Sequence, residues 1–203
     1  PLAMTMVVST VGFNFHVLVP VLTSETLDAG PRTFGLLSAC FGAGAFTGAL
    51  LTAALGRASW KALLLGVGGF SLSLLALAPL DTVAACAALL FVVGVCFTLW
   101  TANSQSLLQL SAPDHLRGRV LSLYLFAFAG LAPLGGLFPG WLSEVGGTQL
   151  AFLVAGLVVL GVLLLLFAIF WLSWRFHTFR ITGDDVEVRS GVFFRTHRRA
   201  PLD

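Results

Sequence analysis

The sequence predicts an all-α polytopic membrane protein with six transmembrane helices, followed by a short antiparallel β segment. Hydrophobic residues make up 58% of the 203 residues and charged residues only 10%, with a mean hydropathy of +0.97. These values exclude an ordinary soluble globular domain. Six apolar runs are long enough to cross a bilayer, which takes about 20 mostly apolar residues. After Arg175 the pattern changes to the two-residue alternation typical of strands.

The six predicted spans lie near residues 3–23, 35–56, 60–80, 82–110, 118–142 and 149–174. The connections between them are short, and none is long enough to separate two membrane domains. We therefore predict one helical bundle over residues 1–174 and a separate tail over residues 175–203. The chain starts at Pro1, inside an apolar run and without an initiator methionine, charged leader or cleavage site. For that reason we expect that the beginning of a longer protein is missing.

Basic residues alternate between the connections. Arg57 and Lys61 flank the second connection, and Arg117 and Arg119 flank the fourth. The first, third and fifth connections hold only Arg32. The arginines that follow the sixth span are Arg175, Arg180, Arg189, Arg195, Arg198 and Arg199. Because connections rich in Lys and Arg stay on the cytoplasmic side, the alternation predicts six spans with both ends of the chain in the cytoplasm.

Small residues at helical spacing predict close packing of the second and third spans. They are Gly42, Gly44, Ala45, Gly48 and Ala49 in the second span and Gly66, Gly68 and Gly69 in the third. In a bilayer, small residues three or four positions apart allow helix backbones to approach each other.

The segment Pro113–Gly140 joins a cationic loop to an apolar helix that glycine and proline interrupt. The loop and gate candidates of the chain are Arg57, Lys61, Asp114, Arg117, Gly118 and Arg119. The candidates for helix bending and packing are Gly130, Pro133, Gly135, Gly136, Pro139 and Gly140. We interpret Arg117 and Arg119 first as cations that set the topology, with pairing across the bundle as the alternative. Asp114 could pair locally with either arginine, which would make the cluster structural.

Polar and amphipathic side chains inside the predicted spans are candidates for a substrate cavity, because an unpaired polar group is costly in hydrocarbon. They are Asn14, His16, Trp100, Asn103 and Gln105. Asn14 and His16 point about 200° apart on a helix, so at most one readily faces a central cavity. Asn14 fits cavity lining and helix–helix hydrogen bonding equally, whereas His16 fits a packing histidine better. For the other three, substrate contact and gate packing are equal alternatives.

The sequence contains no enzymatic constellation. Its histidines lie far apart without metal-ligand spacing, no cysteine has a nearby base, and no nucleophile elbow occurs. We therefore expect no catalysis, no metal or other cofactor, and no nucleic-acid partner.

Several of these motifs resemble those of a known transporter family. They are Asn103, Gln105, Pro113, Arg117-Gly118-Arg119-Val120, Gly130, Pro133, Gly135-Gly136 and Gly140, with Asn14, Pro20, the Gly35–Gly48 stretch and Gly56-Arg57 upstream. They resemble the seventh, eighth, tenth and eleventh helices and a cytoplasmic loop motif of the major facilitator superfamily. The closest resemblance is to bacterial drug and siderophore exporters of the enterobactin-exporter type. It covers residues 3 to about 160.

The resemblance implies the C-terminal six-helix half of a carrier in the bacterial cytoplasmic (inner) membrane. The implied activity is efflux of a small organic molecule by alternating access, with the lipid bilayer, the small-molecule substrate and a missing N-terminal six-helix half as partners. The chain departs from the family in Leu50–Leu55, which lacks the Asp of the loop motif, so an Asp-to-helix gating contact is not expected. No charged residue lies near the centre of any predicted span. A proton-coupled carrier would therefore titrate His16 or a group in the missing half.

The tail after Trp174 alternates apolar and polar residues around turn signals at Gly183-Asp184-Asp185 and Ser190-Gly191, which predicts two or three antiparallel strands. It resembles the opening strands of the bacterial membrane-anchored PH-like domain family. This implies an alternative function, a membrane-anchored interaction or regulatory protein that works through an incomplete PH-like domain. An ordinary basic tail is the other alternative. Since the two families do not normally share a chain, we expect the junction within the sixth span.

Overall fold

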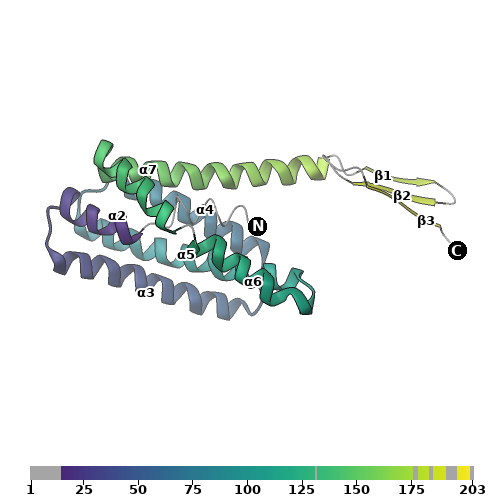
Figure 1. The fold of residues 1–203 in the computed structure, drawn as a ribbon, viewed down its shortest axis with the longest axis horizontal. Coiled ribbons are helices and arrows are strands. Elements are labelled where there is room, and N and C mark those ends of the chain that lie inside the picture. Colours follow the sequence, from purple (N-terminus) through teal and green to yellow (C-terminus); the bar gives the residue numbers. More distant parts are fainter. Residues whose placement is uncertain (1–14, 131, 176–177, 183–184, 191–195, 202–203) are drawn as a thin grey trace. The chain divides into compact units, whose positions relative to one another are not determined.

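The computed structural model of the protein consists mainly of helices (Figure 1). It describes residues 15–130, 132–175, 178–182, 185–190 and 196–201. The chain divides into two compact units, Pro1–Val162 and Leu163–Asp203.

Short connections join the helices. In chain order the elements are α2 (Phe15–Val21), the π-helical turn η1 (Leu22–Thr26), α3 (Pro31–Leu55), α4 (Trp60–Leu77), α5 (Val83–Ser111), the 3₁₀ turn η2 (Asp114–Leu116), α6 (Arg117–Leu125), the π-helical turn η3 (Phe126–Gly130) and α7 (Ala132–Arg175). α7 is two helices joined at a kink, because Gly146 and Gly147 have non-helical backbone angles. Gly147 has a φ of 72°, in the left-handed region that favours glycine.

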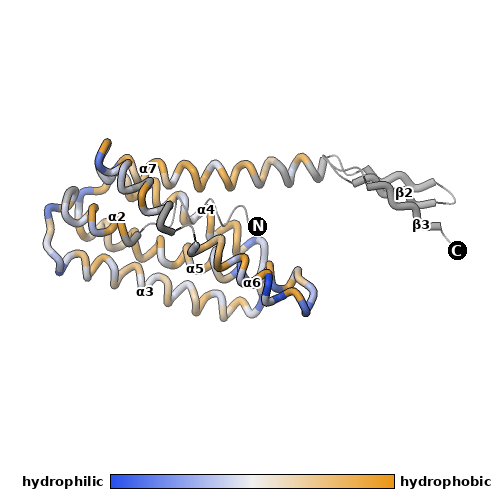
Figure 2. Tube along the Cα trace, in the orientation of Figure 1, coloured by the Kyte–Doolittle hydropathy of each residue, from blue (hydrophilic) through white to orange (hydrophobic). Residues whose placement is uncertain are grey.

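Four described helices are long and apolar enough to cross a membrane: Pro31–Leu55, Trp60–Leu77, Val83–Ser111 and Gly140–Leu165. They overlap the predicted second, third, fourth and sixth spans, in agreement with an all-α membrane protein. The predicted first span, residues 3–23, lies mostly outside the described residues. Figure 2 shows hydrophobic residues along the helices and hydrophilic residues mainly at the connections.

The predicted fifth span, residues 118–142, is not one regular α-helix. It consists of α6, the π-helical turn η3 and the start of α7. Pro133 offers a physical reason, because proline lacks the N–H that would bond to the carbonyl of Ala129, four residues earlier. A π-helical turn is one way in which a helix accommodates such a disruption.

Local sequence signals set the ends of α3 and α4. Pro31 occupies the first turn of α3, where a missing N–H costs nothing. Gly56 ends α3 with a left-handed φ of 65°. Ser59 caps α4, since its Oγ accepts a hydrogen bond from the Ala62 N–H at 3.1 Å. Only residues 56–59 therefore connect the two helices.

α5 is the central helix of the first unit, and both α3 and α4 pack on it (Figure 1). Glycines allow the α3–α5 backbones to touch. A Cβ added to Gly44 would overlap the Phe91 carbonyl oxygen, and one added to Gly94 would overlap that of Phe41. A Cβ on Gly48 would lie 2.6 Å from the Val95 carbonyl oxygen. This is a close helix contact of the kind that small residues permit in membranes.

The predicted packing glycines divide into two groups in the structure. Gly66 and Gly69 of α4 lie against α5, where an added Cβ would come within 2.6 Å of the Trp100 backbone nitrogen and of the Cys96 Sγ, respectively. Gly42 has no atom within 4 Å of such a Cβ. Hence Gly42 makes no close helix contact with the described part of the chain, although its spacing suggested one.

Three strands form an antiparallel sheet in the order β1-β2-β3. They are β1 (Thr178–Thr182), β2 (Asp185–Ser190) and β3 (Thr196–Pro201). The register pairs Ile181 with Val186, and Val186 with Ala200. Apolar positions thus share one face of the sheet, as alternation at a period of two requires.

Candidate functional site

An aromatic cluster lies around Trp100 in the middle of the first unit. Trp100 is fully buried, and its ring centroid lies 5.9 Å from that of Phe70, 6.0 Å from that of Phe97 and 6.5 Å from that of Phe128. These separations are typical of favourable aromatic pairs. The cluster connects α4, α5 and η3. Phe128, which belongs to the fifth span, was not among the site candidates predicted from the sequence.

The indole Nε1 of Trp100 has no hydrogen-bond partner among the residues that the structure describes. A buried N–H of this kind usually finds an acceptor. Tyr124 of α6 attaches the fifth span to α5, since its hydroxyl donates to the Thr101 carbonyl oxygen at 3.3 Å, and its ring stacks on Phe128 at 6.1 Å. Tyr124, just before the π-helical turn η3, and Phe128, within it, therefore both contact α5.

Asn103 lies one turn beyond Trp100 on α5 and is only 1% exposed. Its Oδ1 accepts a hydrogen bond from the Ser59 backbone N–H at 3.0 Å, and its Nδ2 donates to the Leu99 carbonyl oxygen at 2.8 Å. Both ends of the amide are thus bonded to backbone. Neither Trp100 nor Asn103 reaches the surface of the described bundle, whereas Gln105 is half-buried.

The structure does not describe the side chains of two cavity candidates. Asn14 lies outside the described residues. The backbone of His16 belongs to α2, but its side chain is outside what the structure describes.

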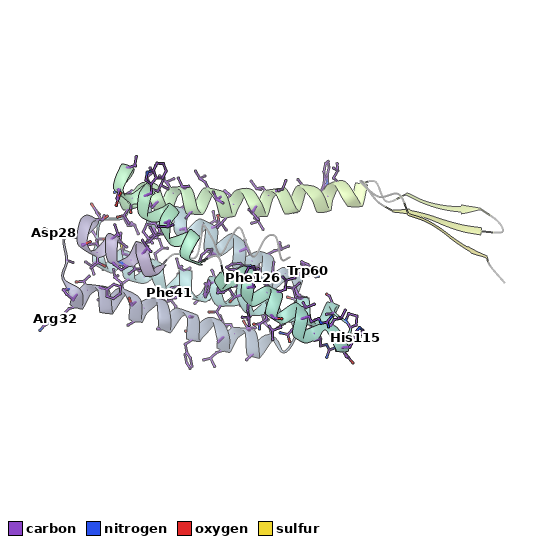
Figure 3. All side chains as sticks on the ribbon, in the orientation of Figure 1. Asp28, Arg32, Phe41, Trp60, His115 and Phe126 are labelled. Atoms are coloured by element: carbon purple, nitrogen blue, oxygen red, sulfur yellow. The ribbon has the colours of Figure 1, made fainter. Side chains whose placement is uncertain are left out.

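The predicted loop cations gather at one end of the helices. Figure 3 shows Trp60 and His115 at the end opposite to Asp28 and Arg32. Trp60 lies between Arg57 of the connection and Lys61 of α4, and His115 precedes Arg117 and Arg119 in the chain. We call this the basic end, defined by Arg57, Lys61, Arg117 and Arg119. All four side chains are exposed.

One ion pair forms in the described part of the basic end. Arg117 Nη2 lies 2.8 Å from Asp114 Oδ1, and the two side chains are 51% and 88% exposed. Exposed pairs of this kind contribute about 0.2–1 kcal/mol at most. An added Cβ on Gly118 would meet nothing within 4 Å. The cluster is a local turn in this structure, with Arg119 left exposed.

The bending and packing candidates of the fifth span lie in or after η3. Gly130 ends η3, and a Cβ there would come within 2.9 Å of the Phe126 ring. Cβ atoms on Gly136 and Gly140 would lie 3.7 Å and 3.9 Å from the methyl groups of Val17 on α2. The start of α7 therefore packs loosely on α2. Pro133, Gly135 and Pro139 belong to the same helix.

No group of three or more His, Cys, Asp or Glu side chains that could hold a metal occurs among the described residues. Around Trp100 and Asn103 the arrangement offers apolar and aromatic packing, with the Asn103 amide bonded to backbone groups.

Comparison with protein families gives one match. A family model described as "Transmembrane secretion effector" matches residues 2–178. The match covers all six predicted spans and extends to the first residue of β1. A search of the curated proteins finds no match.

Proposed function

The chain belongs to the transmembrane secretion effector family, which makes it a multi-pass membrane transporter of the major facilitator type, and from this premise we propose that it exports a small organic molecule by alternating access. We further propose that it is the C-terminal six-helix half of a carrier of the drug- and siderophore-exporter type. The second half would be another six-helix bundle, and the membrane would be the bacterial cytoplasmic (inner) membrane.

The packing of α3 carries the main support for a two-half carrier. α3 packs on α5 through Gly44 and Gly48, but it leaves large apolar side chains exposed. They include Phe46, Leu50, Leu51 and Leu55. Such a face requires lipid or another helix against it. A second half rocking on this bundle would cover part of it, and the substrate would bind between the halves.

The buried geometry supports a division of roles among the candidate residues. The burial of Trp100 and the backbone bonds of Asn103 favour packing at a gate for these two residues. Gln105 is half-buried, so it is the better candidate for substrate contact. Asn14 is proposed as a further cavity residue, with His16 as the alternative, because the two point about 200° apart on a helix. In a proton-coupled carrier, His16 or the second half would supply the titrating group.

Vesicle transport tests the two-half proposal. We expect that this chain alone, reconstituted in lipid vesicles, does not move a small amphipathic dye such as ethidium across the membrane. We expect movement when the chain is combined with a matching six-helix half. Flux by this chain alone would contradict the proposal.

Topology provides a second test of the same proposal. Reporters fused after Gly118 should be on the cytoplasmic side, and reporters fused after Gly30 should be outside, because the basic end follows the positive-inside rule. A reporter after Gly118 that faces the outside would exclude the proposed orientation.

The antiparallel sheet after α7 supports one alternative function. Its three strands follow the membrane helix directly and lie almost wholly beyond the family match. A membrane-anchored protein that works through a PH-like domain would use this segment to bind a partner. Deleting the residues after Trp174 separates the alternatives, because full transport without the tail, and no partner bound by it, would exclude the second one.

A further inference from the structure

The connection between α3 and α4 is fastened to α5 at one point. α3 ends at Leu55 and α4 begins at Trp60, and both helices pack on α5. The four connecting residues include Gly56, whose left-handed backbone turns the chain sharply. At the start of α4, the Ser59 N–H points to the buried Oδ1 of Asn103 at 3.0 Å.

Each hydrogen-bonding group of Ser59 has its own partner. Its N–H donates to Asn103, its hydroxyl accepts from the Ala62 N–H at 3.1 Å, and its carbonyl oxygen accepts from the Leu63 N–H at 3.1 Å. Ser59 therefore caps α4 and at the same time binds α4 to α5. If the Asn103 side chain lost its bond, the cap would have no attachment to α5 among these contacts.

The orientation of the Asn103 amide follows from its partners. Ser59 offers a donor and Leu99 offers an acceptor, so the oxygen must face Ser59 and the NH₂ must face Leu99. A flipped amide would set two donors against each other. The bond from Nδ2 to Leu99, four residues earlier on the same helix, holds the side chain in this position.

The attachment is neutral, although the connection is basic. Residues 50–61 contain Arg57 and Lys61 but no Asp or Glu. Both side chains are exposed, and no ion pair of theirs is found in the described part of the chain. Among the hydrogen bonds of the described residues, the bond to Asn103 is the one that joins this connection to α5.

We infer that Asn103 is a positioning residue whose neutral amide holds the start of α4, and with it Arg57 and Lys61, on α5. The two cations then move with α5 in any conformational change of this half. Because a hydrogen bond between neutral groups is screened little by salt, the attachment persists at high ionic strength. This inference concerns the chain itself and does not require that the proposed transport is correct.

Hydrogen–deuterium exchange on the chain in lipid nanodiscs tests the inference, because exchange reports local opening of individual segments. We expect Asn103→Leu to speed exchange in residues 56–63 by about five- to tenfold, the value of one ordinary hydrogen bond. Exchange in residues 66–77 of α4 should not change. Gln105→Leu is the matched control: it replaces an amide on the same helix for which no hydrogen bond is found in the described part of the chain, and it should leave residues 56–63 as they are.

A merely structural role predicts a different outcome, in which exchange rises equally in residues 56–63 and 66–77. That result, or no change in residues 56–63, would overturn the inference.

Two measurements on the unaltered chain apply even if Asn103→Leu does not fold. The Ser59 amide should exchange more slowly than the His115 amide in the other connection at the basic end, and equal rates would contradict the attachment. The protection should also survive a rise from about 0.1 to 1 M salt, over which screening of exposed charges becomes severe. Loss of protection in salt would indicate an ionic attachment instead.

Discussion

The contact between α3 and α5 differs from the fifth span, although glycine is prominent in both. In the first region, Gly44 and Gly94 bring two regular helices together until their backbones touch. In the second, Gly136 and Gly140 follow a π-helical turn and have only ordinary contact distances to Val17. Glycine provides close approach in one region and accompanies irregular helix geometry in the other. The spacing of glycines in the sequence cannot distinguish these two roles, because each role depends on which atoms face the glycine in the folded protein.

The aromatic cluster joins the two regions. The ring centroid of Phe97 lies 5.9 Å from that of Phe41 on α3 and 6.2 Å from that of Phe128 in η3. Rings can shift and rotate with little loss of contact, whereas touching backbones cannot. We therefore expect α3 and α5 to act as a rigid pair and the fifth span to be more tolerant of change.

Gly94→Ala should break the rigid pair and have the largest effect. The added methyl group would overlap the Phe41 carbonyl oxygen and come within 2.8 Å of the Ala45 backbone nitrogen. Because backbone atoms cannot rotate away, the helices must separate, and we expect a loss of about 1–3 kcal/mol of stability. Thermal unfolding in detergent followed by circular dichroism measures this loss.

Gly42→Ala is the control for that variant, since it adds the same methyl group to α3 where nothing lies within 4 Å. It should leave stability unchanged or slightly raised. Equal effects of the two substitutions would show that backbone contact does not distinguish these glycines.

Gly136→Ala should have a smaller effect of opposite sign. Its methyl group would lie 3.7 Å from Val17, an ordinary contact distance, in a helical position. Alanine at such a position is expected to stabilise by about 0.4–1 kcal/mol, because it restricts the unfolded chain. The same unfolding measurement applies, and a clear loss of stability would mean that the start of α7 is packed as tightly as α5.

Tyr124→Phe should loosen the fifth span slightly. It removes the hydroxyl that donates to the Thr101 carbonyl oxygen but keeps the ring that stacks on Phe128. Polar bonds between membrane helices contribute about 0.6 kcal/mol on average, so we expect a loss of that size. Faster hydrogen exchange in residues 117–130, with α3 unaffected, would locate the change, while faster exchange in α3 would argue against separate behaviour of the two regions.

Arg117→Ala should have the smallest effect. The pair with Asp114 is largely exposed and should contribute less than about 1 kcal/mol, decreasing as salt rises. Unfolding at low and high salt measures it. A large loss that salt does not reduce would indicate a partner for Arg117 other than Asp114.

Much of the helix layout follows from local sequence signals. The helices α3, α4 and α5 begin and end within a few residues of the predicted spans, because long apolar runs with proline before them or glycine after them leave few alternatives. The break after α6 is harder to place. Pro133 predicts an interruption of the helix, but the interruption could be a π-helical turn, a kink or a helix end, since each of these accommodates proline.

The candidate site was predictable only as a set of residue types. Asn103 was a candidate for substrate contact or gate packing, and the structure places its amide against Ser59 and Leu99. Ser59 lies 44 positions earlier in the chain, and no local pattern connects the two. Gly94 was overlooked, although Thr98 follows it four positions later and two small residues at that spacing can mark a packing face.

By itself, the sequence determined that the protein is a membrane protein, where most of its helices lie, and which end of them is basic. These properties are set by hydropathy, by proline and glycine, and by the placement of arginine and lysine, all of which act over short distances. Only the tertiary structure decided which glycines touch a neighbouring backbone, how the fifth span is broken, and which group holds the start of α4. These outcomes depend on residues that become neighbours when α3 and α4 pack on α5.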